Sequence, residues 1–241
     1  MKRTERHHLK ENELVQFVQN ARLAIEANGR QAVMVLVAVG VLVIGVLGYI
    51  GWQSRAQARA GGLLAEAASV EGAYVGPPGE PGAPQPALRF DTERQRYEAA
   101  LEKYGAAAEQ YPGTDAGVFA RYREAALHMT LGNPEEAIVS YQQVIDRGGD
   151  GIYVQMARLG LADAQVRTGQ VEQAINTYKE LSERANTTMP VDGILMQLGR
   201  AYLEAGQTSD AQQTFDRLVS EFPGSPYTVE AQRQLDELKQ T

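Results

Sequence analysis

The sequence predicts an all-α chain, with one N-terminal transmembrane helix followed by an α-solenoid of about four helical hairpins. Two observations predict this class. A stretch of nineteen residues without a charged side chain runs from Ala32 to Ile50. After it, small, aromatic and glycine residues recur at a fixed step of 37 residues. A fixed period of a few dozen residues indicates stacked supersecondary units rather than one globular core.

The first thirty residues predict a cytoplasmic head. Residues 1–30 carry six basic side chains and the twenty residues after Trp52 carry two, and such an excess marks the cytoplasmic side. An amphipathic helix is expected over 11–28, ending before Gly29, with one apolar face formed by Leu14, Phe17, Val18, Ala21 and Ile25. It would lie on the membrane surface or dock a membrane partner. The alternative is a frayed tail with chance periodicity.

Residues 31–52 are expected to span a membrane once. The uncharged run is about 28 Å long as a helix, close to the hydrocarbon thickness of about 30 Å. Tyr49 and Trp52 lie at one end, where amphipathic rings favour the interface. The alternatives are a buried helix of a soluble protein and a cleavable signal peptide, although the run exceeds the usual apolar region of a signal peptide. An uncleaved anchor places the C-terminal part outside the cytoplasm.

Two segments connect the span to the repeats. Residues 53–75 are helix-prone, and we expect them to continue the membrane helix and to form the first helix of repeat one. Residues 76–90 are a Pro/Gly-rich insert that begins GPPGEPGAPQPA. Five Pro and three Gly in those twelve residues exclude a helix or a central strand. A plain spacer is the simplest interpretation of the insert.

Residues 91–241 carry the repeat. The residues that keep the step of 37 are Ala100, Ala137, Ala174 and Ala211, then Tyr104, Tyr141, Tyr178 and Phe215, and also Gly132, Gly169 and Gly206. A glycine relieves a tight turn, an alanine permits close approach of helices, and an aromatic ring fills the gap to the next repeat. Helices are therefore expected over 94–111, 114–131, 134–147, 152–168, 171–184, 191–205, 209–222 and 226–239.

These residues resemble tetratricopeptide repeats. That family has a Gly at the turn between its two helices, a small residue five positions later, an aromatic residue four positions further, and often a Pro ending the second helix. Gly206, Ala211, Phe215 and Pro223 match all four positions. In the first repeat Gln95 stands where the turn Gly is expected, so its first helix is placed before the insert. The step of 37 exceeds the family's usual 34, and insertions between repeats account for this.

The whole layout resembles the YfgM-like ancillary subunits of the SecYEG translocon. Those subunits have a short cytoplasmic head, one span, and a periplasmic tetratricopeptide solenoid that begins just past the membrane. The resemblance implies a bacterial inner-membrane protein with a cytoplasmic N-terminus and a periplasmic C-terminal domain. It also implies a scaffold beside the translocon that works with periplasmic chaperones on emerging secreted clients. The alternative is a structural accessory subunit of another membrane complex, such as a respiratory, envelope-assembly or division complex.

The composition excludes several function classes. The chain of 241 residues has no Cys, which rules out disulfides and cysteine-based nucleophiles or metal sites. Its net charge is -7, and residues 53–241 carry 17 Lys+Arg against 26 Asp+Glu. Because phosphate binding needs a basic face, this acidity argues against a nucleic-acid partner.

No motif suggests catalysis, so the expected site is a protein-binding one. His occurs at positions 7, 8 and 128 only, and no nucleophile-elbow, zinc-protease, phosphate-loop or EF-hand pattern is present. We expect no enzyme activity, no cofactor, no metal and no small-molecule substrate.

The groove on the concave face of the repeats is expected to contain Phe119, Tyr122, Met129, Met156, Leu159, Asp163, Met196, Arg200 and Leu203. Methionines suit apolar partners of varied shape. The alternative is that the last helix or inter-repeat packing covers these side chains.

Overall fold

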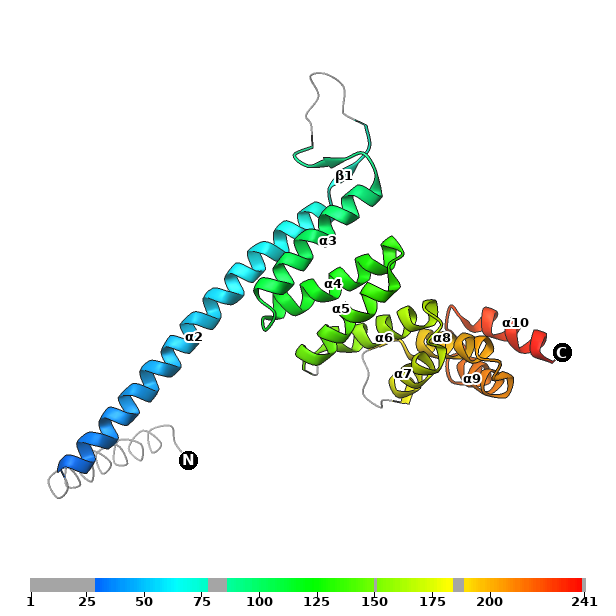
Figure 1. The fold of residues 1–241 in the computed structure, drawn as a ribbon. Coiled ribbons are helices and arrows are strands. Elements are labelled where there is room, and N and C mark those ends of the chain that lie inside the picture. The colour runs from blue at the N-terminus through cyan, green and yellow to red at the C-terminus, as the bar shows by residue number, and fades with distance from the viewer. Residues whose placement is uncertain (1–28, 78–85, 150, 184–188, 240–241) are drawn as a thin grey trace, which may run out of the picture. The chain divides into compact units, whose positions relative to one another are not determined.

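The computed structural model describes residues 29–77, 86–149, 151–183 and 189–239. Its contacts divide the chain into two units, Met1–Arg55 and Ala56–Thr241. The regular elements of the described chain are helices apart from one pair of short strands, which confirms the predicted all-α class (Figure 1). The amphipathic helix expected over 11–28 lies outside the described residues.

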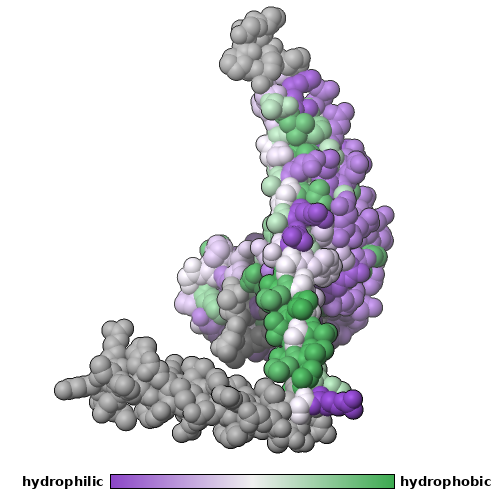
Figure 2. Space-filling view, turned by 90° about the vertical axis from the view of Figure 1, so that its left-hand side faces the viewer, coloured by the Kyte–Doolittle hydropathy of each residue, from purple (hydrophilic) through white to green (hydrophobic). Residues whose placement is uncertain are grey.

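In the first unit, the described chain belongs to helix α2, Gly29–Glu71. Its large apolar side chains are exposed, and Ile44, for example, is 72 % exposed. Figure 2 shows a band of hydrophobic residues along the first part of α2. This helix is long and apolar enough to cross a membrane, where hydrocarbon would surround its side chains.

The second unit continues with eight helices, α3 to α10, each packed against the next along the chain. α4 also contacts α6. Each predicted helix end lies within two residues of the observed one. The helices are α3 Glu93–Gln110, α4 Asp115–Leu131, α5 Pro134–Arg147, α6 Ile152–Arg167, α7 Val171–Glu183, α8 Val191–Glu204, α9 Thr208–Glu221 and α10 Thr228–Leu238.

The turn glycines adopt the backbone conformation that their positions predict. Gly132, Gly169 and Gly206 have φ values of 83°, 77° and 73°. A side chain at such a φ is strained, whereas glycine adopts it without a steric cost. Each of these residues therefore lets the first helix of a hairpin end and the second fold back against it.

The last helix begins later than predicted. The Ser225-Pro226 pair predicts a start at Pro226, but α10 begins at Thr228. The Ser225 carbonyl accepts a hydrogen bond from the Thr228 N–H at 3.2 Å, and the Ser225 hydroxyl accepts one from the Tyr227 N–H at 3.1 Å. These bonds hold a turn over 225–228, and the helix starts where this turn ends.

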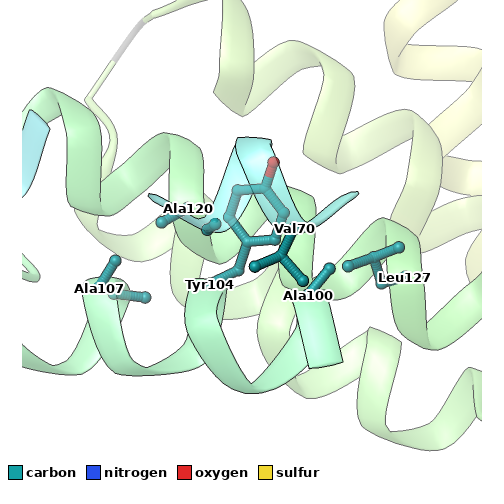
Figure 3. Close-up of a cluster of buried hydrophobic side chains, with 8 residues drawn as sticks. Val70, Ala100, Tyr104, Ala107, Ala120 and Leu127 are labelled. Atoms are coloured by element: carbon teal, nitrogen blue, oxygen red, sulfur yellow. The ribbon is translucent and has the colours of Figure 1, made fainter. Parts of the chain in front are cut away.

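The end of α2 packs against α3 and α4. Val70 of α2 is buried together with Ala100 and Tyr104 of α3 and with Ala120 and Leu127 of α4 (Figure 3). The small alanines let the three helices approach closely, and the tyrosine ring fills the remaining space. The Pro/Gly-rich insert therefore connects two helices, α2 and α3, that pack against each other.

A pair of two-residue strands, absent from the predicted elements, joins the ends of the insert. β1 (Tyr74–Val75) pairs in parallel with β2 (Arg89–Phe90). The Gly76 N–H donates to the Phe90 carbonyl at 3.0 Å, and Arg89 Nη1 donates to the Gly76 carbonyl at 2.6 Å. Aromatic and β-branched residues favour strands. They pair here because α2 and α3 lie side by side and bring both ends of the insert together.

Candidate protein-binding surface

The four repeated aromatic residues lie in the core of the second unit rather than on its surface. Tyr104, Tyr141, Tyr178 and Phe215 are each at most 4 % exposed. Burial is the main reason that the pKa of Tyr104 rises to about 12. The repeated position therefore holds neighbouring helices together and is not available to a partner.

Two of these rings pack directly on a glycine. A Cβ added to Gly160 would lie 2.4 Å from the ring of Tyr141, and one added to Gly199 would lie 2.4 Å from the ring of Phe215. Real Cβ atoms do not approach a ring so closely, because the atoms would overlap. Glycine is therefore required at both positions for the aromatic ring to reach its place.

The hydroxyl groups of the other two rings donate hydrogen bonds to carboxylates. Tyr178 donates a hydrogen bond of 2.5 Å to Asp163 Oδ1, and Tyr104 donates one of 2.7 Å to Glu71 Oε2. The second oxygen of Glu71 pairs with Arg123 Nη2. Glu71 therefore links the end of α2 to α3 through Tyr104 and to α4 through Arg123.

The predicted groove residues lie on the first helices of three hairpins. Arg200 is exposed, seven of the others are half-buried, and Met196 is buried. α4 carries Phe119, Tyr122 and Met129, α6 carries Met156, Leu159 and Asp163, and α8 carries Met196, Arg200 and Leu203.

Met196 does not line an open groove. Its side chain is 1 % exposed and packs in a cluster with Phe215 of α9 and with Ala231 and Leu235 of α10. The last helix covers this position, which is the alternative considered for the groove. The prediction for Met196 was therefore wrong, because a pattern within one repeat does not show where the final helix packs.

An aromatic cluster occupies the α4 and α6 part of this face. The ring of Tyr153 lies 4.8 Å from that of Phe119 and 6.1 Å from that of Tyr122, measured between ring centres. Rings at these separations attract one another. Tyr153 was missed as a site residue, although it lies three positions before Met156 and hence on the same side of α6.

A polar cleft of about 290 Å³ opens between α6, α7 and α8. It contains two predicted site residues, Asp163 and Arg200. The complete lining is Asp163, Val166, Arg167, Tyr178, Gln197, Arg200, Ala201 and Glu204. Arg167 and Glu204 were missed, although they are 37 residues apart, as are Asp163 and Arg200.

The floor of the cleft is partly desolvated. Burial raises the pKa of the Asp163 carboxyl, while the hydrogen bond from Tyr178 and the charge of Arg167 lower it. Burial also raises the pKa of Tyr178, and the neighbouring Asp163 carboxylate adds to this rise. Among the described residues, no three His, Asp or Glu side chains are grouped to hold a metal ion. The cleft is therefore suited to charge-assisted binding.

Stacked hairpins, a core formed by one repeated aromatic position, and accessible polar and aromatic side chains define an α-solenoid that binds other proteins. The chain belongs to the tetratricopeptide repeat-like domain family, whose model matches residues 26–189. A further tetratricopeptide repeat model matches residues 194–225. The resemblance to tetratricopeptide repeats is thus confirmed. Such repeats mediate protein–protein interactions and are generally non-enzymatic scaffolds.

Solved structures show the same fold at low identity. A Podosopora anserina protein with nearly identical TPR-like repeats is 18% identical with a TM-score of 0.52, covering 61% of this chain and 80% of that chain. MamA is 16% identical with a TM-score of 0.52, covering 61% and 79%. A tetratricopeptide repeat protein from Parabacteroides merdae ATCC 43184 is 18% identical with a TM-score of 0.51, covering 61% and 55%. No curated protein sequence matches the chain.

Proposed function

We propose that this protein is a single-pass scaffold of the bacterial inner membrane whose repeats face the periplasm. There it binds SecYEG translocon subunits, periplasmic chaperones or emerging secreted clients. The observation that carries the proposal is helix α2, which contains an apolar stretch long enough for a span and, further along, residues that pack against α3 and α4.

The charge distribution supports the proposed orientation. Basic residues are concentrated before the apolar stretch, and such residues stay on the cytoplasmic side. The absence of Cys permits a direct test of this orientation. A single Ser209→Cys change in the exposed first turn of α9 should react with a membrane-impermeant maleimide in spheroplasts. A matched Thr4→Cys variant should react only after permeabilisation, and the reverse result would contradict the proposal.

The partner is tested by purifying the full-length protein in mild detergent and identifying co-purifying proteins by mass spectrometry. Translocon subunits and periplasmic chaperones in stoichiometric yield are the expected result. A different membrane complex, with the translocon absent, would instead favour a structural accessory subunit. Deleting residues 1–28 separates the two functions further, because an accessory subunit held by its head would lose its complex and a repeat-based scaffold would keep its clients.

A further inference from the structure

The cleft between α6 and α8 lies where long side chains replace small ones of the preceding repeat. α4 packs closely against α6, whereas α6 and α8 pack less closely and leave the cleft of about 290 Å³ between them. Arg167 and Gln197 line the cleft, and the residues 37 positions before them are Thr130 and Gly160. Small residues permit close approach of helices, and longer ones keep the helices apart.

The two walls of the cleft carry opposite charges at equivalent positions. Asp163 and Arg167 lie one turn apart on α6, and Arg200 and Glu204 lie one turn apart on α8. The step of 37 places Asp163 beside Arg200, and Arg167 beside Glu204. Each level of the cleft therefore holds one carboxylate and one guanidinium, so the two walls are complementary to each other.

Arg200 is only weakly held by its partner in the structure. Its guanidinium lies 3.9 Å from the carboxylate of Glu230 on α10, and Arg233 binds the same carboxylate more closely, at 2.6 Å. Ion pairs between exposed side chains contribute little free energy. Arg200 can therefore turn from Glu230 toward Asp163 on α6. The Tyr178 hydroxyl is bonded to Oδ1 of Asp163, so a guanidinium can use the other carboxylate oxygen.

The second level of the cleft is not paired either. Among the described residues, no ion pair includes Glu204, and Arg167 donates only a long hydrogen bond of 3.5 Å to the Met129 carbonyl. Both charged side chains are exposed. Because they extend from facing walls, a small approach of α8 toward α6 would join them.

We propose that this cleft is a joint of the solenoid, which closes when Asp163 pairs with Arg200 and Arg167 pairs with Glu204. Attraction between opposite charges drives the closure. Salt weakens this attraction, because the Debye length falls from about 30 Å at 0.01 M to about 3 Å at 1 M ionic strength. The cleft is therefore narrow at low ionic strength and wide at high ionic strength. This inference does not depend on the proposed scaffold function or on the identity of the partner.

The test measures the distance across the cleft in the full-length protein in nanodiscs. The chain has no Cys, so spin labels can be attached at Thr130→Cys and Thr208→Cys alone. Both positions are exposed and lie outside the cleft, one at the end of α4 and the other at the start of α9. Double electron–electron resonance should show a mean distance that lengthens by about 1–2 Å when NaCl rises from about 20 mM to about 500 mM, which is the size of helix shifts at packed interfaces.

Charge reversal identifies the pairs that are responsible. Arg167→Glu alone should remove or reverse the lengthening, because it places two carboxylates at one level, and Glu204→Arg alone should do the same with two guanidinium groups. Arg167→Glu combined with Glu204→Arg should restore the lengthening. In this combination the charges of α6 at the cleft are all negative and those of α8 all positive. Pairing within one helix is then impossible, so only pairing across the cleft explains the restoration.

Two controls accompany these variants. Lys179→Glu reverses one charge at an exposed position of α7 outside the cleft, so it should keep the wild-type lengthening. Labels at Thr130→Cys and Ile152→Cys join α4 to α6, and salt should not change their distance. A wild-type distance across the cleft that does not respond to salt would overturn the proposal. So would a combined charge reversal that fails to restore the response.

Discussion

The carboxylate of Glu71 joins the end of α2 to α3 and α4, and its removal gives the sharpest test of how these three helices are held together. Glu71→Ala leaves the hydroxyl of Tyr104, a residue that is 2 % exposed, without its acceptor. A buried donor that loses its partner costs about 1–3 kcal/mol. The Glu71 and Arg123 side chains are 20% and 30% exposed, so the loss of this half-buried ion pair adds about 1 kcal/mol. We expect a total loss of about 2–4 kcal/mol.

The matched control is Glu66→Ala, which makes the same change five residues earlier on α2. Glu66 pairs at 2.6 Å with Lys103, and both side chains are exposed, so little stability should be lost. Glu71→Gln should fall between the two, because an amide oxygen still accepts the bond from Tyr104.

The assay is urea unfolding of the full chain in detergent, followed by circular dichroism at 222 nm and by amide hydrogen exchange. Faster exchange should appear in α3 and α4 for Glu71→Ala and not for Glu66→Ala. Equal unfolding midpoints for the two alanine variants would refute the reasoning. So would a loss of protection confined to α8 and α9.

Three further predictions concern the core, the response to pH and the membrane. Gly199→Ala should destabilise the chain by about 1–2 kcal/mol. The added Cβ overlaps the buried Phe215 ring, and the free-energy cost of this overlap exceeds the gain in helix propensity. Gly62→Ala, at a helical site with open space, should stabilise it by up to about 1 kcal/mol, and both are measured by urea unfolding. Burial lowers the pKa of His128 below 6.5, so the unfolded chain takes up the proton first and stability falls as the pH drops below that value. His128→Gln should lack this fall, which unfolding midpoints at pH 7.5 and 5.5 would detect. Deleting residues 31–52 should release the protein from carbonate-washed membranes.

The sequence could predict the helices because each is specified locally. Gly132 ends α4 at a φ of 83° that few other residues adopt, and the 37-residue step repeats this signal along the chain. The pairing of β1 with β2 could not be predicted, because it depends on α2 and α3 lying side by side on either side of the insert. Local chemistry also placed the start of α10 too early, since Ser225 and Pro226 are equally suited to a turn.

The candidate binding surface could be predicted only in part, because it too depends on contacts between segments that are distant in the sequence. The repeat correctly places residues on the first helices of the hairpins, but it cannot show which of them a later helix covers. Met196 is buried because α10 packs over it, whereas Arg200, four positions on, stays exposed. The aromatic contribution of Tyr153 becomes visible only when α4 and α6 are placed together.

The buried periodic residues of this solenoid and its candidate binding residues are therefore different sets. Positions that repeat faithfully, such as Tyr178 and its counterparts, are buried and serve the fold. Positions that keep the step of 37 but change their chemistry remain on the surface, and the inversion from Asp163 to Arg200 is the clearest case. A fold requires the same contact in every repeat, whereas recognition of one partner requires neighbouring repeats to differ. We therefore expect departures from the repeat at accessible positions to determine what this chain binds.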